Sequence, residues 1–137
     1  GRSTRAASFH RKQKSFDCAL ASYVIVHLTK KVGMIFIKIM EKTAKKRIII
    51  FTPNGFIPQD ESNDNILQVH KSGWTVKEMQ LLGYKVQGIN GWKALRREKA
   101  SIKLKPKLFW LIISDITQIF VKNNPKKAFH LLCIKDL

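Results

Sequence analysis

The sequence predicts an α/β domain of about four strands and three helices. The first observation is the run 46–51, in which two cations precede four apolar residues and Thr-Pro-Asn-Gly follows. Such a run is typical of a strand buried on both faces of a helix-covered parallel sheet. The second observation is helical periodicity on either side of this run, over 29–45 and again after Pro106. Because ligands of open α/β sheets bind beyond the carboxyl ends of the strands, we expect residues 52–54 to face a ligand.

The elements before this strand complete a β–α–β unit. Segment 18–28 begins as a strand of small apolar residues and ends as a loop or a helical turn. The crossover from this strand through the helix to 46–51 is expected to be right-handed, as is typical of parallel strands. The helix at 29–45 has an apolar stripe that we expect to face the core, formed by Val32, Ile35, Phe36, Ile39 and Met40.

A second helix is predicted to begin after Trp74. Thr75 and Glu78 have the spacing of a capping box. Trp74 and Met79 occupy the positions of a hydrophobic staple, in which the residues before and inside the first turn pack together. Gly83 has the place of the glycine that ends a helix in a left-handed conformation.

The C-terminal third predicts two strands around a long helix. Residues 84–89 alternate as an outer strand does, and Asn90-Gly91 should end that strand. Residues 128–134 predict a last, largely buried strand. The helix that begins at Pro106 has an apolar face that we expect to cover the core, formed by Leu108, Phe109, Ile112, Ile113, Ile116, Ile119 and Phe120.

The charge of the chain leaves two interpretations open. The 137 residues carry a formal net charge of +17, which favours a nucleic acid or an anionic membrane surface as a partner. However, the lysines are spread along the chain, as they are on ordinary solvated faces. Residues 1–14 hold five cations and no acid, which predicts a basic flexible tail before a domain at 15–137.

Two cysteines and the hydropathy indicate a soluble cytoplasmic protein. Cys18 and Cys133 lie in apolar, strand-like runs without metal-ligand spacing, so we expect buried, reduced thiols and no metal site. No signal peptide follows the basic start. The longest apolar stretch, 108–121, is shorter than the ~20 residues that span a bilayer, so no membrane span is expected.

Five segments carry a family resemblance: Val24-Ile25-Val26-His27-Leu28, Thr52-Pro53-Asn54-Gly55, Gln68-x-His70-x-Ser72-Gly73-Trp74, Gly88-Ile89-Asn90-Gly91 and Ser114-Asp115-x-Thr117-Gln118. Together with the order of elements, they resemble class I S-adenosylmethionine-dependent methyltransferases. The resemblance begins near Ser15, at what would be the fourth strand of that fold, and continues to the C-terminus. Within this superfamily the chain is similar to a prokaryotic subgroup of small methyltransferases.

The resemblance implies the C-terminal half of a seven-stranded, Rossmann-like methyltransferase sheet. The half that would hold the cofactor in a glycine-rich loop is not matched, because no Gly-x-Gly occurs and only fourteen residues precede Ser15. Tyr23 and His27 fall where the family lines its S-adenosylmethionine pocket. Tyr23 and Val26 replace the two carboxylates of the usual Asp-Val-Ile-Glu-His-Leu, which predicts a vestigial cofactor site.

Six residues are candidates for binding the methyl acceptor. For Thr52, Pro53 and Asn54, the geometry of a turn is an equally good explanation. For Trp74, the hydrophobic staple of the helix is one. His27, assigned above to the cofactor, is equally a candidate for an ordinary structural histidine. No catalytic residue is assigned, because methyl transfer requires mainly the alignment of donor and acceptor. The candidates are Thr52, Pro53, Asn54, Gln68, His70 and Trp74.

Three functional hypotheses follow from these observations. The first is a truncated or degenerate S-adenosylmethionine-dependent methyltransferase that is inactive alone. The second is half of a split methyltransferase, completed by a partner chain that pairs with the open edge strand at 17–22. The third is a basic nucleic-acid-binding module, which would show steeply salt-dependent affinity.

Overall fold

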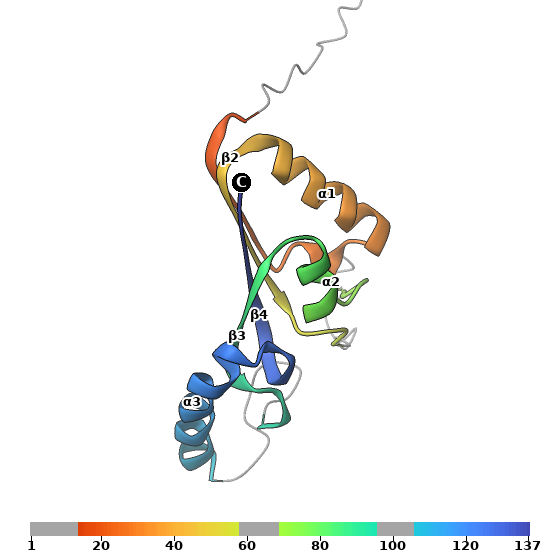
Figure 1. Ribbon diagram of the computed structural model, residues 1–137. Helices are drawn as coiled ribbons and strands as arrows, with labels where there is room; N and C mark the ends of the chain where they lie inside the picture. Colours follow the sequence, from red (N-terminus) through yellow and green to blue (C-terminus); the bar gives the residue numbers. More distant parts are fainter. Residues whose placement is uncertain (1–13, 58–68, 96–105) are drawn as a thin grey trace, which may run out of the picture.

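A computed structural model of the chain describes residues 14–57, 69–95 and 106–137. These residues form an α/β fold with one four-stranded sheet and three α-helices (Figure 1). Residues 1–13 of the predicted tail and the candidate Gln68 lie outside the described residues. The elements are β1 Phe16–Ser22, η1 Ile25–His27, α1 Lys30–Thr43, β2 Ala44–Pro53, α2 Val76–Leu81, β3 Lys85–Trp92, η3 Lys93–Leu95, α3 Lys107–Asn123, η4 Pro125–Lys127 and β4 Ala128–Asp136.

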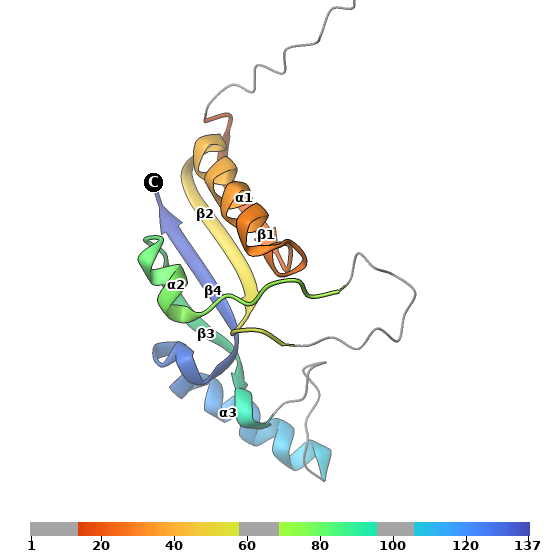
Figure 2. The same ribbon diagram turned by 90° about the vertical axis from the view of Figure 1, so that its right-hand side faces the viewer.

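The strand order is β1-β2-β4-β3, so the last strand of the chain lies between β2 and β3 (Figure 2). β1 and β2 are parallel, whereas β4 runs antiparallel to both of its neighbours. In the register, Ile50 of β2 pairs with Ala21 on one side and with Cys133 on the other. The prediction that 46–51 is an interior strand is confirmed, but the sheet is mixed rather than parallel.

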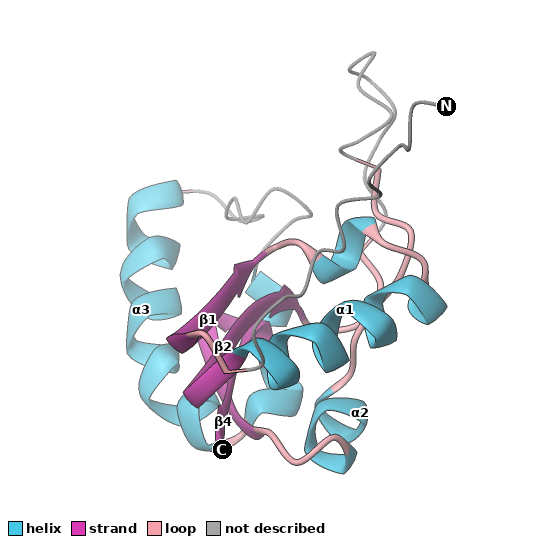
Figure 3. Cartoon of the chain, turned by 90° about the horizontal axis from the view of Figure 1, so that it is seen from above, coloured by secondary structure: helices cyan, strands magenta, loops and turns pink. Residues whose placement is uncertain are grey.

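Helices α1 and α2 lie on one side of the strands and α3 lies on the other (Figure 3). Ile48, Ile50 and Thr52 of β2 are fully buried, and alternate with Ile49 and Phe51, which stay half-buried. The prediction that both faces of this strand are buried is therefore wrong for the second face. Since side chains alternate along a strand, only every second residue points into the described core.

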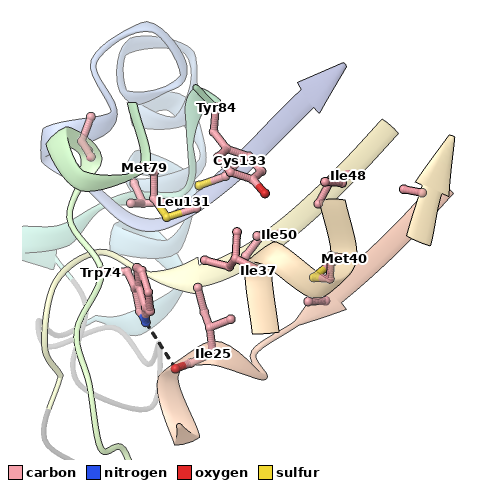
Figure 4. Close-up of a cluster of buried hydrophobic side chains, with 13 residues drawn as sticks. Ile25, Ile37, Met40, Ile48, Ile50, Trp74, Met79, Tyr84, Leu131 and Cys133 are labelled. Atoms are coloured by element: carbon pink, nitrogen blue, oxygen red, sulfur yellow. Dashed lines mark hydrogen bonds between the residues drawn. The ribbon is translucent and has the colours of Figure 1, made fainter. Parts of the chain in front are cut away.

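The core lies between the sheet and helices α1 and α2, and Trp74 is its largest side chain (Figure 4). The Trp74 ring packs on Gly33 of α1, where an added Cβ would lie 2.6 Å from the ring. This contact turns Gly33, Ile37 and Met40 inward. The predicted stripe of α1 is therefore correct only in part: Met40 is buried and Phe36 packs against the core, as expected. Val32, Ile35 and Ile39 are exposed instead.

Helix α2 begins and ends as the sequence predicts. The Thr75 side chain accepts a hydrogen bond from the Glu78 amide, and Glu78 accepts one from the Thr75 amide, which completes the capping box. Trp74 and Met79, the staple residues, are both fully buried in the core. Gly83 follows the helix with a φ of +86°, the left-handed conformation that glycine adopts without strain.

Strand β3 continues through Asn90-Gly91, so the prediction that these two residues end the strand is wrong. Both residues have a positive φ, and the pairing with β4 is irregular between Ile89 and Trp92. They therefore form a bulge inside the strand, because two residues in the left-handed conformation offset the ladder without ending it.

Helix α3 packs on the sheet with its polar side. Gln118 donates to the Gly88 carbonyl and accepts from the Gly91 amide, and the Thr117 hydroxyl accepts from the Trp92 amide. These bonds satisfy the outer edge of β3, which is the physical reason why the polar side faces inward. The predicted inward stripe is therefore wrong, because the residues left exposed are Leu108, Phe109, Ile112, Ile116, Ile119 and Phe120.

The membrane-span expectation concerns the same helix. No helix among the described residues combines the length and the apolar character that crossing a bilayer requires.

The two cysteines differ in environment. Cys133 of β4 is fully buried in the core, and burial raises the pKa of its thiol to about 12. Cys18 lies on the edge strand β1 and is exposed, so the prediction of two buried thiols is wrong for this residue. The reason is its position on the sheet face opposite α1 and α2, which the described helices leave open at β1.

We predict that the folded protein has one fast-reacting thiol. A disulfide reagent at about pH 8 should modify Cys18 within minutes and reach Cys133 only in denaturant, because a buried thiol with a raised pKa forms little thiolate. Mass spectrometry of the labelled chain measures the stoichiometry. Cys18→Ser should remove the fast phase, and rapid double labelling of the native chain would contradict the described β4 environment.

We also predict that Gly91→Ala disrupts the contact of α3 with β3. The new Cβ would lie 2.5 Å from the Ser114 hydroxyl and 2.6 Å from its carbonyl oxygen, so the free energy of unfolding should fall by about 2 kcal/mol or more. The matched control is Gly55→Ala, which shares the positive φ but meets only the Lys93 side-chain end at 3.7 Å. It should cost about 1 kcal/mol from strain alone. Equal losses in urea unfolding would refute the steric contribution.

Candidate functional site

The carboxyl ends of β1 and β2 gather most of the described candidate residues. Tyr23 and His27 follow β1, and Thr52 to Asn54 end β2. The segment 69–75 lies alongside, because the Lys71 and Ser72 amides both donate to the Val26 carbonyl. The sheet edge at which ligands of α/β proteins bind is thus formed by three separate stretches of the chain.

His27 and His70 form a pair at this edge, with ring centroids 5.1 Å apart. Nδ1 of His27 lies 3.2 Å from the Val69 carbonyl oxygen, and Nδ1 of His70 lies 2.7 Å from that of Ile57. Because a carbonyl oxygen only accepts hydrogen bonds, Nδ1 of each ring acts as the donor in these contacts, which leaves Nε2 for another partner. Both side chains are half-buried. The pair therefore places two imidazole rings side by side just after β1.

Tyr23 lies beside a third histidine, His130. Its ring packs edge-on against His130 of β4 at a centroid distance of 5.2 Å, and partial burial raises the pKa of its phenol. The Tyr23 φ of +54° is unusual for a residue other than glycine, and its amide is held by the Phe51 carbonyl. The side-chain nitrogen Nδ2 of Asn90 contacts Nδ1 of His130. Tyr23 therefore joins a polar cluster separate from the His27–His70 pair.

The three candidates at the end of β2 are all buried. Thr52 and Pro53 are buried, and the Thr52 hydroxyl has no hydrogen-bond partner within the described residues. Asn54 is 8% exposed, and its side-chain nitrogen lies 2.8–3.1 Å from the carbonyl oxygens of Pro125, Lys126 and Ala128. These contacts make Asn54 a clamp between the end of β2 and the segment that leads into β4.

Trp74 is a core residue rather than part of an exposed rim. It is fully buried, and its indole Nε1 donates to the Ile25 carbonyl (Figure 4). The same nitrogen donates to the Ser72 hydroxyl. The Lys30 ammonium lies 3.9 Å from the ring centroid and also pairs with Glu78. Trp74 thereby fixes the segment that carries His70 against η1, the turn that carries His27.

Three residues at this edge were missed by the sequence analysis: Asn90, Lys93 and His130. The Lys93 ammonium donates to the Asn54 carbonyl oxygen at 2.6 Å, and the other two residues join Tyr23. Two of them had a signal in the sequence: Asn90 belongs to the Gly88-Ile89-Asn90-Gly91 segment, and His130 is the one polar residue in the apolar run 128–134. Lys93 had none. Within 14–57, 69–95 and 106–137, no three metal-ligating side chains lie together.

Comparison with protein-family models and with curated proteins finds no match to this chain.

We predict that Asn54→Ala destabilises the fold. Three carbonyl oxygens would lose their shared donor in a buried place, which should lower the free energy of unfolding by about 2 kcal/mol. Asn123→Ala, at the exposed end of α3, is the matched control and should change it by less than about 0.5 kcal/mol. Chemical denaturation monitored by circular dichroism measures both. Equal stability of the two variants would show that the clamp contributes nothing.

Proposed function

We propose that this chain is built on the C-terminal half of a class I S-adenosylmethionine-dependent methyltransferase sheet and does not transfer methyl groups on its own. The observation that carries the proposal is the position of β1 at one edge of the sheet. Among the described residues β1 pairs only with β2, so its outer side is open. The resemblance assigns the remaining strands of a Rossmann-like sheet to that open side.

The residues at the cofactor edge support the second part of the proposal. Tyr23 occupies a position that the resemblance assigns to a carboxylate, and it packs against His130. Val26 occupies the other such position and is fully buried. Neither side chain offers a negative charge or an acceptor pair to the ribose or the amino group of S-adenosylmethionine. The chain also contains no Gly-x-Gly loop that would approach the cofactor closely.

A second candidate function is that of a split methyltransferase, in which another chain supplies the glycine-rich half. The specific observation in its favour is the apolar character of the open edge. Phe16 and Leu20 of β1 are 64% and 63% exposed, and an exposed apolar edge strand is a template for pairing with a further strand. In this case the His27–His70 pair would face the completed cofactor site.

The experiment that tests the first proposal is calorimetric titration with S-adenosylmethionine and S-adenosylhomocysteine. We expect no binding to the isolated chain, with circular dichroism showing that the chain is folded. Tight binding to the isolated chain would contradict the proposal, because it would require a cofactor site complete without a glycine-rich half.

Adding a separately expressed glycine-rich half of a class I methyltransferase distinguishes the two candidates. If the chain is a degenerate half, the mixture should bind the cofactor only after Tyr23→Asp, which restores a carboxylate and suits the left-handed backbone there. If the chain is an active half, the unmodified mixture should bind it. Failure of both mixtures, with the two halves shown to associate, would argue against methyltransferase ancestry.

A further inference from the structure

The outward face of α3 is a continuous apolar surface without a partner among the described residues. Its six largest side chains are each between 53% and 73% exposed. They follow one another at spacings of three, four and one residues, so they form one stripe opposite the buried Ser114. We call this surface the α3 stripe: Leu108, Phe109, Ile112, Ile116, Ile119 and Phe120.

Cations lie at both ends of the stripe. Lys107 is the first residue of α3, Lys122 lies in its last turn, and both are exposed. Lys126 and Lys127 follow in η4 and are also exposed. From 107 to 127 the sequence holds four lysines and one aspartate, in a chain of net charge +17. An apolar stripe between cations is the pattern of helices that lie in the plane of an anionic bilayer surface.

Charge argues against a second copy of the chain as the occupant. The whole-chain charge of +17 makes copies of the chain repel one another. The exposed lysines of α3 and η4 add to this repulsion where two copies would meet through α3. An anionic lipid surface suits both the apolar side chains and the lysines. The apolar side chains would be buried among the acyl chains, and the lysines would pair with the headgroup phosphates.

We propose that the α3 stripe and the lysines at its ends dock this protein on membrane surfaces rich in anionic lipid. The helix would lie in the plane of the headgroups, with its polar side still bonded to β3 through Gln118 and Thr117. The stripe is independent of the proposed methyltransferase function, because α3 packs on β3 while β1 lies at the other edge of the sheet. Docking would therefore leave β1 accessible.

The test is co-sedimentation of the purified chain with phosphatidylcholine vesicles, with and without phosphatidylglycerol, at low and high salt. Binding is expected only to vesicles that contain phosphatidylglycerol, and it should weaken as salt rises, because exposed charges are screened. The double variant Ile112→Glu/Ile116→Glu should lose binding by about tenfold or more. Both side chains are exposed, so circular dichroism should show an unchanged fold.

Two matched controls separate the stripe from general properties of the chain. Leu81→Glu changes an exposed leucine at the end of α2, 78% exposed, and should bind as the unmodified chain does. Lys107→Gln/Lys122→Gln should weaken binding more than Lys71→Gln/Lys77→Gln, which removes the same charge elsewhere.

Three results would overturn the proposal. Equal binding to vesicles with and without phosphatidylglycerol would remove the role of the lysines. Undiminished binding by Ile112→Glu/Ile116→Glu would remove the role of the stripe. Absence of vesicle binding, together with a dimer in sedimentation equilibrium that the same variant abolishes, would identify a second copy as the occupant.

Discussion

The packing of Trp74 is the contact on which the helical layer depends. Its ring lies on Gly33 of α1, and its indole nitrogen donates to the Ile25 carbonyl of η1. One side chain thus joins the segment before α2 to two elements that lie much earlier in the sequence. Trp74 also precedes the cap of α2 directly. A larger residue than glycine at position 33 would displace the ring, because a Cβ would lie within 2.6 Å of it. The orientation of α1, and with it the choice of exposed residues, follows from this contact.

At the β3 edge of the sheet, α3 is held by hydrogen bonds rather than by the burial of apolar side chains. Gln118 binds the β3 backbone through both its donor and its acceptor, much as a neighbouring strand would. Gly88 and Gly91 permit the close approach, since a Cβ at either would meet the backbone of α3. A helix held by its polar side leaves its apolar side outward. The same constraint that protects the β3 edge therefore creates the α3 stripe.

The described residues thus leave two separate surfaces without a partner, the outer edge of β1 and the α3 stripe. Between them, at the carboxyl ends of β1 and β2, lie the His27–His70 pair and the cluster of Tyr23 with His130. A chain that pairs at β1 would approach these histidines, whereas a lipid surface at α3 would not. The two proposals therefore call for different partners and fail independently.

By itself, the sequence determined those features that short stretches of chain decide. The capping box of α2 and the interior place of β2 follow from neighbouring residues, and the structure confirms both. Only the tertiary structure decided which face of α1 and α3 is buried, because those faces depend on Trp74 and on the open edge of β3, which are distant in sequence. The meeting of His27 with His70 was decided in the same way, since it requires the chain to bring together residues 43 positions apart.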